Sequence, residues 1–120
     1  MLLLQKRHED ANGNITAQRV GTVVVKYGKS TGGWVEDATY EIHYGNITGK
    51  SFYNAATMGL RSHDYARNSK GKSVLVKETG WAPADATPTH IVLQFSSSHG
   101  GAYVGTVGNT FWVDNVGLVY

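Results

Sequence analysis

The carboxylates are the first side chains in this chain to consider for chemistry. Hydrolysis of a glycosidic bond needs two of them facing one another, roughly 5 to 10 Å apart. Asp37 and Glu41 fall on one face of an expected strand, where the strand rise separates them by about 13 Å. A closer partner for either acid could come only from another strand. Both residues are therefore expected to lie on the solvent-exposed side of this strand.

Nucleophilic and metal chemistry have weaker support. The stretch from Ser96 to His99 puts serines beside a histidine, but neighbouring residues on a strand point to opposite faces, and no Gly-x-Ser-x-Gly turn is present. These serines are expected to bond backbone groups where a strand ends. The five histidines show no metal-binding spacing such as His-Glu-x-x-His, and the absence of cysteine excludes thiolate sites and disulfides.

One acid occupies an unexpected place. In the terminal segment the residues Trp112, Val116, Leu118 and Tyr120 share one side of an extended strand, and Asp114 lies among them. A carboxylate removed from water without partners is costly. Asp114 must therefore be paired, hydrogen-bonded, metal-bound or close to an exposed rim.

The elements that would position these residues are almost all strands. Alternation of apolar and polar residues is clearest over 34–44, and an Asn-Gly pair at Asn12 and Gly13 indicates a tight turn. Residues 46–71 are expected to form a long loop with a possible helical turn at 54–60. Strands are expected at 2–6, 20–27, 34–44, 73–78, 89–96 and 109–120.

Composition supports one folded domain covering residues 1–120. The sequence is 41% hydrophobic and 17% charged, and it carries 15 glycines, which suits short strands joined by turns. This pattern predicts an all-β protein, an antiparallel β-sandwich. If a strand of the sandwich is missing, an open edge remains that could pair with a partner. A net charge of +2 indicates neither a nucleic-acid partner nor a membrane surface, and no segment approaches the ~20 apolar residues of a membrane span.

The C-terminal quarter carries a resemblance to a known family. Its parts are the segment from Pro88 to Ser98, the glycine loop Gly105-Thr-Val-Gly108, and the ending Thr110-Phe-Trp-Val-Asp-Asn-Val-Gly-Leu-Val-Tyr120. Over 88–120 the chain resembles the carbohydrate metabolism domain of Bacteroidetes surface and exported proteins, most closely its C-terminal portion. The family domain is longer, and it usually has an acidic residue where this chain has Gly100, Gly101 and Ala102.

The resemblance implies a jelly-roll sandwich, similar to carbohydrate-binding modules, in an exported, periplasmic or cell-surface protein with neighbouring domains. Such surfaces stack aromatic rings on sugars and use polar side chains to fix the hydroxyls. The expected partner is a polysaccharide or oligosaccharide, without nucleic acid or membrane insertion. The candidate carbohydrate-binding residues are Trp81, Tyr53, Tyr65, Arg61 and Asp64.

Other readings remain open. Each loop aromatic could instead cover the edge of the sandwich, and the domain could be a structural or interaction module beside an enzyme or adhesin. A fragment of a glycoside hydrolase is the third reading, although no catalytic residue is assigned. In calcium-stabilised jelly rolls an Asp of the final strand often holds a structural ion, so Asp114 is a candidate calcium ligand. A buried hydrogen bond is the default expectation for Asp114, and no other cofactor is expected.

Overall fold

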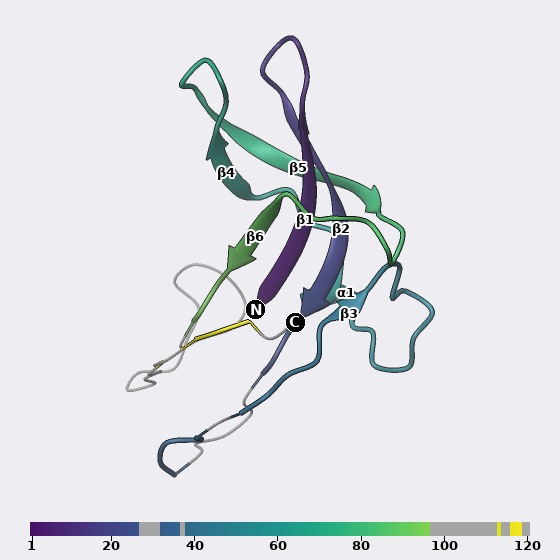
Figure 1. The fold of residues 1–120 in the computed structure, drawn as a ribbon, viewed down its shortest axis with the longest axis vertical. Coiled ribbons are helices and arrows are strands. Elements are labelled where there is room, and N and C mark those ends of the chain that lie inside the picture. The colour runs from purple at the N-terminus through teal and green to yellow at the C-terminus, as the bar shows by residue number, and fades with distance from the viewer. Residues whose placement is uncertain (27–31, 37, 97–112, 114–115, 119–120) are drawn as a thin grey trace.

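The computed structural model describes residues 1–26, 32–36, 38–96, 113 and 116–118. Six strands and one short helix lie in these ranges (Figure 1). They are β1 (Leu2–Glu9), β2 (Ile15–Val23), β3 (His43–Tyr44), α1 (Ala55–Met58), β4 (Asp64–Arg67), β5 (Ser73–Trp81) and β6 (His90–Leu93). The expectation of an all-β chain is confirmed. Asp114, the glycine-rich loop and most of the predicted final strand lie outside the described residues.

The strands form one mixed sheet in the order β4-β5-β2-β1-β6, with β3 pairing β2. The pair β2 and β5 is parallel, and the other pairs are antiparallel. The prediction of a purely antiparallel arrangement therefore misses the central pair. A parallel pair needs a long crossover. Here the chain between the two strands provides it and contains β3, α1 and β4. A jelly-roll sandwich stays a prediction.

The predicted Asn-Gly turn joins β1 to β2. Asp10 Oδ1 accepts hydrogen bonds from the backbone N–H groups of Asn12 and Asn14, each at 2.9 Å. Gly13 has a φ of +82°, a left-handed conformation that glycine adopts without a steric cost. The turn chemistry read from the sequence is confirmed here.

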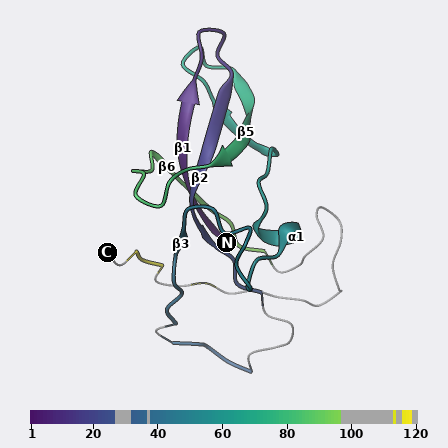
Figure 2. The same cartoon turned by 90° about the vertical axis from the view of Figure 1, so that its right-hand side faces the viewer.

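The sheet curls, so that the β1–β2 and β4–β5 hairpins extend in the same direction at one end of the molecule (Figures 1 and 2). Across the tips, Asn68 Nδ2 donates to the carbonyl of Gly13 at 2.9 Å, and the backbone N–H of Ser69 donates to Glu9 Oε1 at 2.8 Å. Lys70 Nζ also reaches the carbonyl of Ala11 at 3.3 Å. These contacts give the sheet an inner, concave face and an outer face.

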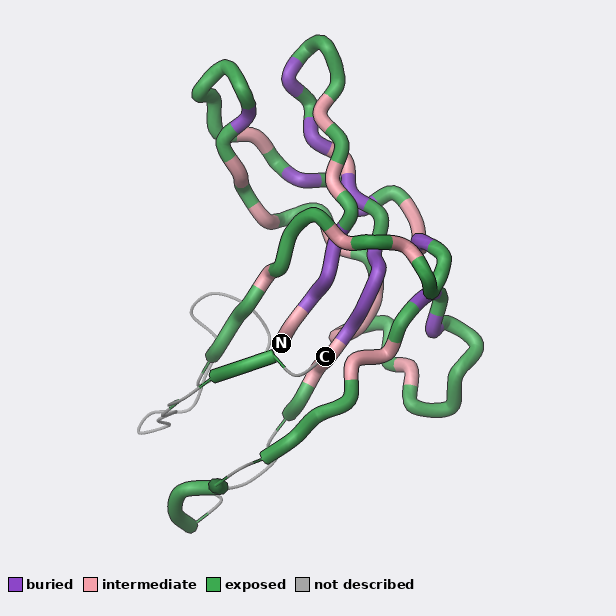
Figure 3. The backbone as a smooth tube through the Cα atoms, in the orientation of Figure 1, coloured by how far each residue is buried: buried purple, intermediate pink, exposed green. Residues whose placement is uncertain are grey.

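Two apolar clusters pack against the sheet, one on each side. Ile15, Ala17 and Val76 form the cluster on the inner side. Leu4, Val20 and Ala82 form the other cluster, which lies on the opposite side, because Leu4 precedes Gln5 and Gln5 points inward to Glu78. The buried residues follow the strands β1, β2 and β5 (Figure 3). Along β5 burial is limited to one face, since the residues that alternate with the inner cluster are exposed. In β1 and β2 the consecutive residues 3–5 and 19–22 are buried, so these strands are covered on both faces there.

Several predicted elements differ from the structure. Among the described residues of 34–44, the strand β3 is limited to His43–Tyr44, which pair with Thr22 and Gly21 of β2. Trp34, at the start of this expected strand, is 66% exposed. The helical turn at 54–60 is confirmed as α1, capped by Asn54, whose Oδ1 accepts from the N–H of Ala56 at 3.0 Å.

Strand boundaries and side-chain exposure also differ from the predictions. β2 begins earlier than the predicted 20–27 and ends at Val23, and β4 forms inside the expected loop. On β6, Ile91 and Leu93 are 48% and 50% exposed rather than buried in a sandwich. This strand is last in the described strand order.

Candidate functional site

A buried ion pair lies at the centre of the inner face. Arg19 on β2 and Glu78 on β5 both have side chains that are 0% exposed. Arg19 Nε donates to Glu78 Oε2 at 2.6 Å, and Arg19 Nη2 donates to Glu78 Oε1 at 2.5 Å. This two-point contact is the geometry in which a guanidinium and a carboxylate bind most strongly.

Arg19 uses its remaining donors on the chain around it. Nη1 donates to the Thr22 hydroxyl at 3.1 Å and to the carbonyl of Met58 at 2.9 Å. Nη2 donates its second hydrogen to the carbonyl of Gly59 at 3.0 Å. The five N–H donors of a guanidinium are therefore all satisfied. Arg19 ties the end of α1 to the sheet and keeps no donor for a ligand.

Glu78 is saturated in the same way. Besides its two bonds from Arg19, it accepts from Gln5 Nε2 at 3.0 Å and from the backbone N–H of Arg61 at 2.8 Å. Burial by itself would raise the pKa of Glu78, but the hydrogen bonds and charge of Arg19 outweigh it, so the pKa lies below its ordinary 4.5. A carboxylate held ionised in this way is not suited to act as a general acid.

The lowered pKa of Glu78 predicts acid sensitivity. The unfolded chain takes up this proton at higher pH than the folded chain does, so the contribution of Glu78 to stability is present above about pH 4.5 and is lost as pH falls through the lower folded pKa. The free energy of unfolding, measured by denaturant titration from neutral pH to pH 3, should fall less steeply in Glu78→Gln than in the natural chain. Equal slopes would contradict this assignment.

Four of the five predicted binding residues surround this ion pair. Arg61 Nη2 contacts Asp64 Oδ1 at 2.8 Å, and Arg61 Nη1 contacts Gln94 Oε1 at 3.3 Å. The Trp81 ring lies 5.3 Å from the Arg19 guanidinium carbon and meets the Tyr53 ring edge to face at 6.4 Å. The contacts of these four residues are internal, and they brace the inner face.

Tyr65 is placed differently. It follows Asp64 on β4, so its side chain points to the outer face, where it is 69% exposed. Strand register identifies its companions, because paired residues point to the same side of a sheet. The outer face, as the name is used below, comprises Lys6, His8, Thr16, Gln18, Tyr65, Arg67, Ser73, Leu75, Lys77 and Thr79.

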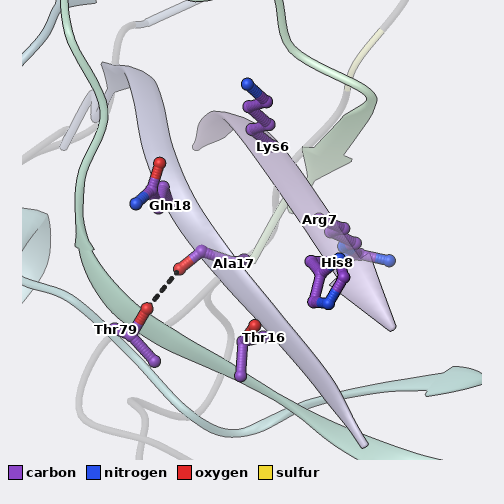
Figure 4. Close-up of a pocket in the computed structure, with 7 residues that line it drawn as sticks. All are labelled: Lys6, Arg7, His8, Thr16, Ala17, Gln18 and Thr79. Atoms are coloured by element: carbon purple, nitrogen blue, oxygen red, sulfur yellow. Dashed lines mark hydrogen bonds between the residues drawn. The ribbon is translucent and has the colours of Figure 1, made fainter. Parts of the chain in front are cut away.

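A hollow of about 290 Å³ is lined by residues of β1, β2 and β5 at this face (Figure 4). Lys6, His8, Gln18 and Lys77 make no side-chain hydrogen bond or ion pair within the described part of the chain. Thr79 is the extra residue of a bulge opposite Ala17 and Gln18, and its hydroxyl donates to the Ala17 carbonyl at 3.4 Å. The face therefore offers polar groups that no internal contact occupies.

The described residues contain histidine, aspartate and glutamate side chains that could bind a metal. Within them, no three His, Asp or Glu side chains come together as a metal site. Asp114, the predicted calcium ligand, lies outside these ranges. In the same described ranges, no helix has the length and apolar character needed to cross a membrane.

Sequence reasoning missed Arg19 and Glu78, although a signal was available. Arg19 continues the inward series Ile15 and Ala17, and Glu78 continues the inward series Val74 and Val76. A base and an acid, each on the apolar side of its own strand, indicate a buried pair, since neither could be left alone there.

The geometry thus separates an internal network on the inner face from an exposed polar outer face with one projecting aromatic ring. In comparisons with family models, curated proteins and solved structures, no match to this chain was found.

Proposed function

We propose that this domain is a non-catalytic carbohydrate-binding module and that the outer face is its binding surface. The observation that carries the proposal is Tyr65, whose ring projects 69% exposed from an open sheet face beside unoccupied polar side chains. An exposed aromatic ring can stack on the apolar face of a sugar ring, while neighbouring polar groups bind its hydroxyls.

The spacing on the sheet suits an extended ligand. Tyr65 pairs with Leu75, so Lys77 is its diagonal neighbour, roughly 7–8 Å away. Beyond Lys77 the register leads to Thr16 on β2 and then to His8 on β1. A sugar chain stacked on Tyr65 can therefore cross β5 and reach hydrogen-bonding groups on two further strands.

The family resemblance of residues 88–120 supports the same proposal independently of the outer face. It favours an exported or surface protein of polysaccharide use, with this domain beside others in a longer chain. A structural calcium ion held by Asp114 remains part of that proposal. The binding residues, however, move from the loops to the outer face, because Trp81, Tyr53, Arg61 and Asp64 are engaged in internal contacts.

The glycoside hydrolase reading has less support from the geometry. Asp64 and Glu78 do share the inner face, but Asp64 pairs with Arg61 and Glu78 accepts four hydrogen bonds. A glycosidase acid needs a raised pKa, whereas the pKa of Glu78 is lowered.

An interaction module is the second candidate function. β6 is last in the described strand order, and Ile91, Leu93 and Phe95 are 48%, 50% and 51% exposed. Exposed apolar rows on a terminal strand mark surfaces that pair with other chains. This candidate predicts a chain that binds a protein neighbour and no glycan.

Replacing Tyr65 by alanine should weaken sugar binding. In affinity gels containing host and plant polysaccharides, the natural chain should be retarded by at least one polymer, and Tyr65→Ala should lose about tenfold in affinity through the lost stacking surface. Trp34→Ala is the matched control, since Trp34 is 66% exposed outside the outer face and its loss should leave retardation unchanged. A natural chain that no polymer retards would sink the proposed function.

A further inference from the structure

The outer face carries a charge of one sign. Lys6, Arg67 and Lys77 contribute three formal positive charges, while the whole chain has a net charge of only +2. The ten outer-face residues include none of the nine acids of the chain.

The described strands contain three carboxylates, and none is on the outer face. Glu78 and Asp64 point to the inner side and pair with arginines there. Glu9, at the end of β1, accepts hydrogen bonds from the N–H and hydroxyl of Ser69. In the adjoining turn, Asp10 accepts from the backbone of Asn12 and Asn14. These contacts hold the negative charge away from the hollow, and within the described part of the chain Lys6 and Lys77 have no ion-pair partner.

From this separation of charge we infer that the outer face selects a polysaccharide bearing carboxylates, a uronic-acid polymer, over neutral chains. The inference rests on the proposed function and specifies its ligand class. Carboxylates would contact Lys6 and Lys77, the Tyr65 ring would stack on a sugar, and Thr16 and Gln18 would bind hydroxyls. Complementary charge of this kind steers binding and gives specificity.

The spacing of the cations favours a moderately charged polymer. From strand spacing and rise, the Cα atoms of Lys6 and Lys77 lie roughly 12 Å apart, and those of Lys77 and Arg67 roughly 14 Å. The outer-face residues between these cations are uncharged and include Thr16, Gln18, Tyr65, Ser73 and Leu75. A densely sulfated chain would leave most of its charges unpaired on such a surface, whereas a chain with at most one carboxylate on each sugar leaves fewer unpaired.

A nucleic acid fits less well. Proteins that hold single strands stack successive bases on several aromatic rings along a basic groove. Tyr65 is the only aromatic residue among the ten outer-face residues. One ring beside Leu75, Ser73 and Lys77 can stack on one sugar but offers no second ring for a series of bases.

The test compares polygalacturonate with the same polymer after its carboxyl groups have been reduced to alcohols. The natural chain should bind the charged polymer more tightly, and added salt should weaken that preference. Lys6→Gln/Lys77→Gln should lose about 5- to 30-fold in affinity for polygalacturonate, as expected for two exposed ion pairs, and keep its affinity for the reduced polymer.

The matched control is Lys26→Gln/Lys50→Gln, which removes the same charge from exposed positions outside the outer face. It should keep at least half of the natural affinity, and thermal unfolding midpoints should agree among the three proteins. Equal binding of both polymers overturns the inference and leaves the proposed function standing. Binding of neither polymer also overturns the inference, and the proposed function then fails only if no polysaccharide in the affinity gels is bound either. An equal loss in the control, or tighter binding of a single-stranded oligonucleotide or a sulfated glycan, also overturns the inference.

Discussion

Arg19→Leu should lower the free energy of unfolding by roughly 3–5 kcal/mol, the usual cost of leaving one member of a buried ion pair without its partner. Glu78 would keep its bonds from Gln5 and the backbone of Arg61 but lose both bonds from the guanidinium. The carbonyls of Met58 and Gly59 would also lose their donor. Chemical denaturation monitored by tryptophan fluorescence measures the change.

The double variant Arg19→Leu/Glu78→Leu is the control for this prediction. It removes both charges together, so no buried carboxylate is left unpaired, and it should be more stable than Arg19→Leu alone. If the single variant is as stable as the natural chain, or the double variant is the less stable of the two, the ion pair does not have the role assigned to it.

Gly13→Ala should destabilise the chain by roughly 2–5 kcal/mol. The left-handed φ of +82° costs an L side chain about 1–2 kcal/mol. A Cβ at this position would lie 2.5 Å from Asn68 Nδ2, so the buried bond from Asn68 to the Gly13 carbonyl would be disturbed, at about 1–3 kcal/mol. Asn68 cannot simply swing away, because its Oδ1 accepts from the N–H groups of Lys70 and Lys72.

Gly71→Ala separates the two contributions. Gly71 has a φ of +77°, and a Cβ there would meet nothing within 4 Å. This variant should therefore show the backbone cost alone, about 1–2 kcal/mol. Equal losses for the two variants, compared by thermal or denaturant unfolding, would mean that the contact between the hairpin tips adds nothing to stability.

The local features of the fold could be read from the sequence with fair success. Alternation and valine content indicated strands, and the Asn-Gly pair indicated the turn where Gly13 now has a positive φ. The segment 34–44 alternates clearly, yet among its described residues the strand is limited to His43 and Tyr44, which pair with β2. Alternation alone cannot show whether a neighbour will be available.

The candidate site was predicted less well. Loops often carry function, so the sequence pointed to the aromatic residues expected in loops as sugar-binding residues. Trp81 instead ends β5 and packs against Arg19. Tyr65 lies on β4 and points to the opposite face from the other four predicted binding residues, Trp81, Tyr53, Arg61 and Asp64. Tyr65 is exposed because alternate residues of β4 point to opposite faces, and the sequence predicts a loop, not a strand, over these residues.

The sequence by itself determined the local chemistry of this protein: strands rather than helices, a glycine turn, and a base and an acid placed on the apolar sides of their strands. The tertiary structure alone decided that Arg19 and Glu78, 59 residues apart, would meet through the parallel pairing of β2 with β5. It also decided that lysines from β1 and β5 would share an outer face with Tyr65. The reason is physical, since turns and alternation depend on neighbouring residues, whereas the choice of strand partners depends on the burial and charge pairing of the whole sheet.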